Sequence, residues 1–271
     1  MEHNDLTIVS VYGHNSGASA LPSIKRSMAE LPGSRGLLLS IAKPDNLPNN
    51  IEWKQIGFIN YLQYSIFMMH QLYAFIDTEY CLIVQDDGWV LDGDNFMPEY
   101  YEYDYIGAPS HCGFEPQGEG FNLFLNFTWV GTPGVRVVQN GGFSLRSKRF
   151  LSACNKHGIT HLQANEIHGW NEDAQLSALL KPQLQYLGYR YAPDHIAKYF
   201  SMEYMGPGFH TEEFDFGLLL GCHAQSRKLM DDDHIIVPAD PTKAYGEMEF
   251  LDYLQSTGYT VEYRYEAPVE V

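Results

Sequence analysis

The first 90 residues alternate between short apolar runs and helical patterns. The runs at 6–12, 36–41 and 80–84 are rich in Val, Ile and Leu and have the length of buried strands. Between them, residues 21–31 and 59–76 carry apolar side chains at every third or fourth position, which is typical of helices with one buried face. Strands that alternate with helices form a parallel sheet covered on both faces. The sequence therefore predicts an α/β fold with a mostly parallel central sheet flanked by helices.

The rest of the chain continues this pattern without a clear boundary. Further strands are predicted at 103–108, 139–146, 214–221 and 259–265, and further helices at 147–156, 172–180 and 250–256. The segment 112–134 is rich in Gly, Phe and Asn and predicts a long loop with room for one short strand, and the acidic segment 230–241 predicts a surface loop. Because no repeat or linker separates two units, we expect a single domain, 1–271.

The composition argues against several classes of function. The chain of 271 residues holds 34 Asp and Glu against 17 Lys and Arg, a net charge of −17. Nucleic acids and anionic lipid surfaces are bound by clustered cations, so neither is an expected partner. We find no signal-peptide pattern and no apolar run near the ~20 residues of a membrane span, which predicts a soluble cytoplasmic protein. The 4 cysteines contain no C-x-x-C pair, so we expect reduced, mostly buried thiols.

Acidic residues follow directly on the third predicted strand. Gln85, Asp86, Asp87 and Gly88 come after the apolar run 80–84. Asp-Gly is a common turn dipeptide, so a simple turn is one interpretation. In parallel sheets, however, ligands bind beyond the carboxyl ends of the strands, and carboxylates there can hold Mg²⁺ or Mn²⁺ together with substrate phosphates. Such a cation would supply the positive charge that an acidic protein needs for an anionic substrate.

Two glycines at the start of a later strand suggest a close contact. Asn140 is followed by Gly141 and Gly142. Paired glycines fit either a β-bulge or a place where the backbone approaches a ligand, with Asn140 available to bind a hydroxyl group. No helix follows these glycines directly, so they are not a dinucleotide-binding fingerprint.

An aromatic side chain precedes two carboxylates at a predicted helix start. Trp170 comes just before Glu172 and Asp173. Acidic residues at this position often only compensate the helix dipole. An aromatic ring beside carboxylates also suits a sugar, which offers a C–H face and several hydroxyl groups. His223 ends an apolar run, where a structural role is the simpler interpretation.

Several motifs, taken in their order along the chain, resemble one family. They are YSIFM (64–68), QDDG (85–88), YDYIGAP (103–109), NGGFSLRS (140–147), NEDA (171–174) and YFSME (199–203). Together they resemble a bacterial family of GT-A-type glycosyltransferases that is found among surface-polysaccharide genes and catalogued as a domain of unknown function. The resemblance covers about residues 6–223. It implies a nucleotide-sugar donor, a divalent metal and transfer to a hydroxyl group of a glycan or related acceptor.

The resemblance implies which residues bind the metal. Gln85 and Asp87 occupy the two ends of a D-x-D-like triplet, in which Gln85 replaces the usual first carboxylate. Asp87 would bind the metal, with Asp86 as a second candidate. GT-A enzymes often add a histidine from the C-terminal part of the chain. We assign this role to His223, with His210 as the alternative.

The resemblance also implies contacts with the two substrates. Glu172 and Asp173 look like the carboxylates that GT-A enzymes place beside the acceptor, with Asp173, or else Glu172, as general base in an inverting reaction. The expected donor-binding residues are Val11, Tyr12, Gly13, Tyr64, Ser65, Gln85, Asp86, Asn140, Gly141, Gly142 and Trp170. About 1–110 would form a nucleotide-binding half and about 111–271 an acceptor half, which could contact a lipid-linked acceptor peripherally. A glycoside hydrolase and a non-catalytic carbohydrate-binding protein are the alternatives.

Overall fold

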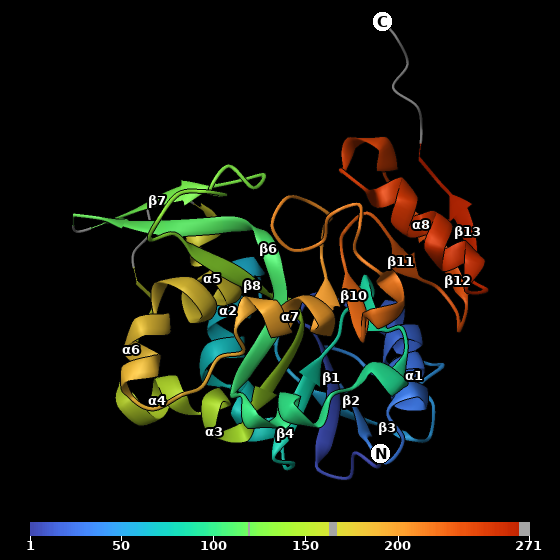
Figure 1. Ribbon diagram of the computed structural model, residues 1–271. Helices are drawn as coiled ribbons and strands as arrows, with labels where there is room; N and C mark the ends of the chain where they lie inside the picture. The colour runs from blue at the N-terminus through green and yellow to red at the C-terminus, as the bar shows by residue number, and fades with distance from the viewer. Residues whose placement is uncertain (119, 163–166, 266–271) are drawn as a thin grey trace, which may run out of the picture.

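A seven-stranded sheet forms the centre of the protein (Figure 1). The computed structural model describes residues 1–118, 120–162 and 167–265, except for the side chains of residues 167 and 168. The strand order is β3-β2-β1-β4-β8-β6-β7. These strands are β1 (Leu6–Tyr12), β2 (Arg35–Ser40), β3 (Ile51–Gln55), β4 (Tyr80–Ile83), β6 (Tyr105–Gln117), β7 (Gly120–Phe124) and β8 (Arg136–Ser147).

The two halves of this sheet differ in strand direction. Strands β3, β2, β1 and β4 pair in parallel, whereas β8 is antiparallel to both β4 and β6, and β6 is antiparallel to β7. The predicted α/β class is therefore confirmed, with the parallel pairing confined to the four strands from the N-terminal part of the chain.

Helices cover both faces of the parallel half, which explains why its strands read as unbroken apolar runs. In β1, Ile8 belongs to a core cluster shared with Ile24 of α1 (Leu21–Glu30). The next residue, Val9, belongs to a cluster on the other face with Phe67 of α2 (Tyr61–His70). A sheet buried on both faces needs apolar residues at successive positions rather than at alternate ones.

Two small three-stranded sheets extend the structure beyond the central one. The first has the order β5-β10-β9, built from β5 (Gly88–Val90), β10 (Gly221–His223) and β9 (Ser201–Met202). The second contains β11 (Lys228–Leu229), β12 (His234–Val237) and β13 (Thr260–Tyr263), and lies beside α8 (Glu247–Ser256) (Figure 1). The remaining helices are α3 (Lys148–Leu151), α4 (Ala153–His157), α5 (Glu172–Ala174), α6 (Lys181–Tyr186) and α7 (Asp194–Phe200).

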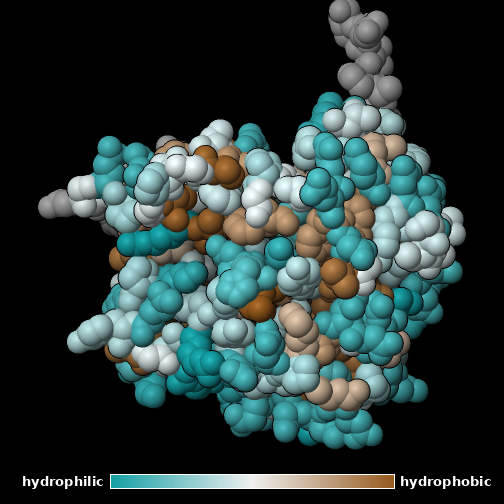
Figure 2. All heavy atoms as spheres, viewed as in Figure 1, coloured by the Kyte–Doolittle hydropathy of each residue, from teal (hydrophilic) through white to brown (hydrophobic). Residues whose placement is uncertain are grey.

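The surface in view is mostly polar, with apolar residues gathered toward its middle between the β6–β7 hairpin and α8 (Figure 2). Among the described residues, no helix is both long enough and apolar enough to cross a membrane.

Four predictions about individual elements are wrong in whole or in part. The segment 112–134 contains one short strand, β7, as allowed for, but β6 also continues into it as far as Gln117. The predicted surface loop 230–241 contains β12. The predicted helix 59–76 ends at Gln71, where φ is −124°, and the apolar spacing continues through a 3₁₀ turn at Leu72–Phe75.

The apolar run 214–221 is the fourth. It forms a 3₁₀ turn at Phe216–Leu218 rather than a strand. The ring of Phe216 packs edge-on against Phe250 of α8, with ring centroids 5.2 Å apart. The run is thus apolar because it packs on α8, and a strand begins only at Gly221.

Candidate active site

Strand pairing brings His223 next to the acidic turn that follows β4. Strands β5 and β10 pair antiparallel with His223 opposite Gly88. The Nε2 atom of His223 then lies 3.2 Å from Asp87 Oδ1 and 3.2 Å from Gln85 Oε1. Asp87 and His223 are each 7% exposed. Three side chains that could bind a metal therefore converge on one point.

Asp87 and His223 shift each other's pKa. Burial acts to raise the pKa of the Asp87 carboxyl, but the facing His223 imidazole lowers it overall. Burial acts to lower the pKa of His223, but the charge of Asp87 raises it overall. Within the described part of the chain, the buried Asp87 Oδ1 meets His223 Nε2 in an ion-pair contact but accepts no well-aligned hydrogen bond. A buried carboxylate oxygen is unfavourable unless its charge is fully compensated, and a bound cation would supply that compensation.

The donor atoms of this group fit a divalent cation. Asp87 offers a carboxylate oxygen, Gln85 an amide oxygen and His223 an imidazole nitrogen, and Mg²⁺ and Mn²⁺ accept oxygen-rich sets of this kind. Over the described ranges, no three His, Cys, Asp or Glu side chains form a metal-binding group, so a site here depends on Gln85. The Tyr64 hydroxyl accepts a hydrogen bond of 3.0 Å from Gln85 Nε2 and so turns Oε1 toward His223.

Asp86 is not brought together with Asp87 and His223. Its carboxylate Oδ2 lies 2.9 Å from Nζ of Lys228, and its backbone N–H donates to the Tyr12 hydroxyl at 3.1 Å. The structure therefore gives Asp86 a cationic partner of its own and directs its carboxylate away from the metal-binding group.

Two cavities meet at Gln85. The first, which we call the β1 cavity, measures about 690 Å³ and lies beyond the carboxyl end of β1. The second, the Asp173 cavity, measures about 420 Å³. Tyr61, Tyr64 and Gln85 line both of them. Among the predicted donor-binding residues, the β1 cavity is also lined by Val11, Tyr12, Gly13 and Asp86, and the Asp173 cavity by Ser65, Asn140 and Gly142.

The start of α2 places its tyrosines at both cavities. Asn60 precedes the helix, and its side chain accepts a hydrogen bond from the Gln63 N–H, while the Gln63 side chain accepts one from the Asn60 N–H. This reciprocal cap fixes where the helix begins. The first turn then carries Tyr61 and Tyr64 to the junction of the cavities.

Asp173 is the lining carboxylate with the most strongly shifted pKa. From the described residues it accepts hydrogen bonds only from backbone groups, the N–H of Ala174 at 2.7 Å and the N–H of Gly141 at 3.4 Å. Burial, followed by the negative charges of Glu172 and Glu203, raises the pKa of Asp173 to about 7. A carboxyl group that titrates near neutral pH is suited to proton transfer.

Glu172 has a different environment from its neighbour. Its Oε1 lies 2.9 Å from Nη2 of Arg146, whose side chain is fully buried. Because Glu172 neutralises this buried cation, it is held in an ion pair and is the weaker candidate for a base. The two adjacent carboxylates, which the resemblance ranks with Asp173 first, thus have different environments in the structure.

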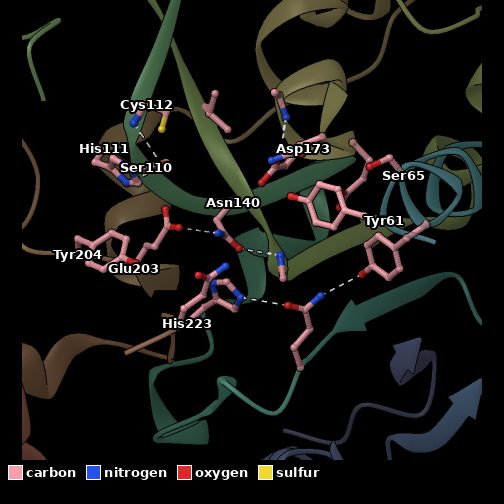
Figure 3. Close-up of a pocket in the computed structure, with 18 of the residues that line it drawn as sticks. Tyr61, Ser65, Ser110, His111, Cys112, Asn140, Asp173, Glu203, Tyr204 and His223 are labelled. Carbon is pink, nitrogen blue, oxygen red and sulfur yellow. Dashed lines mark hydrogen bonds between the residues drawn. The ribbon is translucent and has the colours of Figure 1, made fainter. Parts of the chain in front are cut away.

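The two glycines make room for protein side chains. A Cβ at Gly142 would lie 2.2 Å from His223 Nε2, and a Cβ at Gly141 would lie 2.2 Å from Glu172 Oε1. The close contacts at these positions are therefore with His223 and Glu172. Asn140 Oδ1 accepts from the Gly142 N–H, and its Nδ2 donates to Glu203 Oε1 at 3.0 Å (Figure 3).

Trp170 and His210 have other surroundings. Trp170 stacks on His161 with ring centroids 6.4 Å apart, and the described residues that line the two cavities do not include it. His210 Nε2 donates to the Lys198 carbonyl at 2.7 Å, and burial lowers the pKa of His210 to about 4. Of the two histidines considered, His223 is the one beside Asp87.

Comparison with known proteins identifies the family. Residues 50–223 match the model of a family described as "Protein of unknown function (DUF5672)". The chain belongs to this DUF5672 family. No curated protein matches it. An active-site mutant of LgtC is similar at 14% identity, with a TM-score of 0.46, over 95% of this chain and 97% of that one.

The galactosyltransferase LgtC in complex with donor and acceptor sugar analogues is also similar. It has 14% identity and a TM-score of 0.44, over 93% of this chain and 95% of that one. Both similarities are remote, and neither carries an activity over to the DUF5672 chain.

Two site residues of this DUF5672 member escaped the sequence analysis. Lys228 lines the β1 cavity, and Glu203 lines the Asp173 cavity. Glu203 ends the YFSME motif, which was a signal without an assigned role, and Lys228 follows His223 closely in the chain. Their roles come from contacts with residues distant in sequence, Asn140 and Asp86.

Proposed function

We propose that the protein is a metal-dependent glycosyltransferase that moves a sugar from a nucleotide-diphosphate sugar to a hydroxyl group of a glycan or related acceptor, as in surface-polysaccharide synthesis. One observation carries this proposal. In the candidate metal-binding group, Gln85 lines both the β1 cavity and the Asp173 cavity, His223 lines the Asp173 cavity, and Asp87 lies 3.2 Å behind His223 Nε2. A donor in the first cavity and an acceptor in the second would react at this junction.

The β1 cavity is the proposed nucleotide site. It lies beyond the carboxyl end of a parallel strand, which is the usual ligand position in such sheets. Lys228 supplies a local cation there, held by Asp86 at 2.9 Å. This cation suits a diphosphate and explains how a chain with a net charge of −17 could hold an anionic donor.

The metal-binding group would act on the leaving group. Asp87 and His223, with the amide oxygen of Gln85, would hold the cation. When bound, a divalent cation supplies Lewis-acid stabilisation of the departing diphosphate. The Tyr64 hydroxyl keeps the Gln85 amide in the orientation that this needs.

Asp173 is the proposed general base. As the acceptor oxygen attacks the anomeric carbon, Asp173 takes the hydroxyl proton, and the bond between that carbon and the diphosphate oxygen breaks. A single displacement of this kind inverts the anomeric configuration. The pKa of Asp173, raised to about 7, lets its carboxylate accept a proton near neutral pH.

The experiment is a calorimetric titration with a panel of nucleoside diphosphates, with and without Mn²⁺. We expect at least one nucleotide to bind in the presence of Mn²⁺ and to be released by EDTA. If none binds, or if EDTA makes no difference, the proposal is wrong, and a glycoside hydrolase or a carbohydrate-binding protein becomes the better explanation. If a nucleotide does bind in this way, hydrolysis of a panel of nucleotide sugars would identify the donor. NMR of the transfer product would give its anomeric configuration.

A further inference from the structure

Two carboxylates in the Asp173 cavity form no ion pair with a Lys or Arg side chain of the described residues. Asp173 accepts hydrogen bonds from backbone N–H groups alone within that part of the chain. Glu203 accepts one hydrogen bond at Oε1 from Asn140, and its buried Oε2 has no partner among the described residues. The third acidic residue of the lining, Glu172, is neutralised by Arg146.

No described residue that lines this cavity is a lysine or an arginine. The cavity of about 420 Å³ has the size of a small-molecule site. Figure 3 shows Asn140 between Asp173 and His223, with Glu203 beside the Asn140 amide. The acidic groups thus line a space large enough for a ligand, and the lining imidazole of His223, which could balance them when protonated, is already paired with Asp87.

This arrangement favours a ligand rich in hydrogen-bond donors. The negative charges of Glu172 and Glu203 already disfavour ionisation of Asp173. A cation in the cavity would be attracted by both unpaired carboxylates, whereas a third carboxylate or a phosphate would be repelled by them. A charge-assisted hydrogen bond to a carboxylate is also about twice as strong as a neutral one.

We propose that the acceptor bound in the Asp173 cavity is an amino sugar, whose ammonium group donates to the carboxylate of Glu203 while a hydroxyl group of the same sugar faces Asp173. The proposal rests on the proposed glycosyltransferase function, since it names the substrate class of the acceptor site. It makes Glu203 a specificity-determining residue. The carboxylate of Glu203, and that of Asp173 once it is ionised, disfavour acidic sugars.

The test measures sugar binding by NMR titration with glucosamine, glucose and glucuronate at about pH 6.5, where an amine is protonated. Each sugar is titrated with and without Mn²⁺ and a nucleoside diphosphate. We expect glucosamine to bind about tenfold more tightly than glucose, and glucuronate to bind least. Glu203→Gln should remove most of this advantage and change the glucose affinity by less than about twofold.

Two further variants keep the result interpretable. Glu203→Asp retains the charge and should retain part of the preference for the amine. Glu213→Gln removes an exposed carboxylate outside the cavity and should change nothing. Thermal unfolding of each variant shows whether the fold is kept.

Three results would overturn the proposal. Glucuronate or glucose could bind as tightly as glucosamine, or Glu203→Gln could weaken all three sugars equally. Glu203→Gln could also weaken Mn²⁺ binding and leave the sugar preference intact, which would make Glu203 a metal-site residue. If no nucleotide binds but glucosamine is still preferred, the glycosyltransferase function fails while the amine site stands.

Discussion

The imidazole Nε2 of His223 lies 3.2 Å from the carboxylate Oδ1 of Asp87. The two residues are distant in the chain and meet because β10 pairs with β5, which sets His223 opposite Gly88. Each is buried, and each favours the charged form of the other, since the pKa of Asp87 is lowered and that of His223 is raised. A cation that binds Nε2 of His223 would have to displace a proton from it. Metal binding here can therefore be tested from either side of the pair.

Asp87→Asn should abolish Mn²⁺-dependent nucleotide binding. The amide keeps the shape of the side chain but removes the negative charge that would hold the cation. Calorimetry with the nucleotide that binds the unchanged protein measures the effect. Asp94→Asn, at an exposed position after β5, is the matched control and should bind as before. Undiminished metal-dependent binding by Asp87→Asn would contradict the assigned ligand.

Gly142→Ala should disturb the metal-binding group without touching its ligands. The added Cβ would lie 2.2 Å from His223 Nε2, so the imidazole must move. We expect Mn²⁺-dependent nucleotide affinity to fall by about tenfold or more, because ligand geometry must be held within about 0.5 Å. Gly57→Ala is the control, since nothing lies within 4 Å of its added Cβ. Equal affinities for the two variants would show that the position of His223 is unimportant.

Asp173→Asn should leave nucleotide binding intact and remove sugar transfer. A general base must be ionised, and the pKa of Asp173 is raised to about 7. The transfer rate of the unchanged protein should therefore rise with pH through about 7 and level off above it. Rates measured from about pH 5 to pH 9 test this. A fully active Asp173→Asn protein would refute its role.

The same substitution should stabilise the folded protein at alkaline pH. The folded pKa of Asp173, about 7, lies above its ordinary value of 3.8, so the folded state binds its proton more tightly. The free energy of unfolding that this proton contributes is fully present below about pH 4 and is lost as pH rises through about 7. Asp173→Asn should therefore melt at a higher temperature than the unchanged protein at pH 8, with the gain disappearing toward pH 4. A gain that does not depend on pH would have another cause.

The sequence predicts best where structure is local. Residues 6–12 and 80–84 read as buried strands because helices cover both faces of the sheet there, and the acidic turn follows the second of them. Strand β7 could be placed only somewhere within 112–134, because its five residues are all half-buried and no apolar run marks its bounds. A strand with little buried surface leaves a weak pattern in the sequence.

The physical difference between neighbouring carboxylates could not be derived from the sequence, where only the family resemblance ranks Asp87 ahead of Asp86. Asp86 and Asp87 differ only in the partner each one meets, Lys228 for the first and His223 for the second. Both partners come from the C-terminal part of the chain. Glu203 also became a candidate site residue only through the structure. Its carboxylate contacts Asn140, and its Oε2 has no partner among the described residues. Contacts between distant segments are set by the fold as a whole and leave no local signal.

The pairing of Lys228 with Asp86 predicts opposite effects for two substitutions. Lys228→Met removes the lysine that lines the β1 cavity and leaves Asp86 without this ion pair, so nucleotide affinity should be about tenfold lower than in the unchanged protein. The nucleotide affinity of the variant should also depend less steeply on salt concentration. Lys243→Met, at an exposed position outside the cavity, is its control.

Asp86→Asn, in contrast, frees Lys228 from its ion pair at 2.9 Å and should leave nucleotide affinity unchanged or increase it. If Asp86 bound the metal, the same substitution would weaken Mn²⁺-dependent binding. Titrating the nucleotide into both variants, with Mn²⁺ and with EDTA, separates the two roles, because only a metal ligand loses the difference between these conditions.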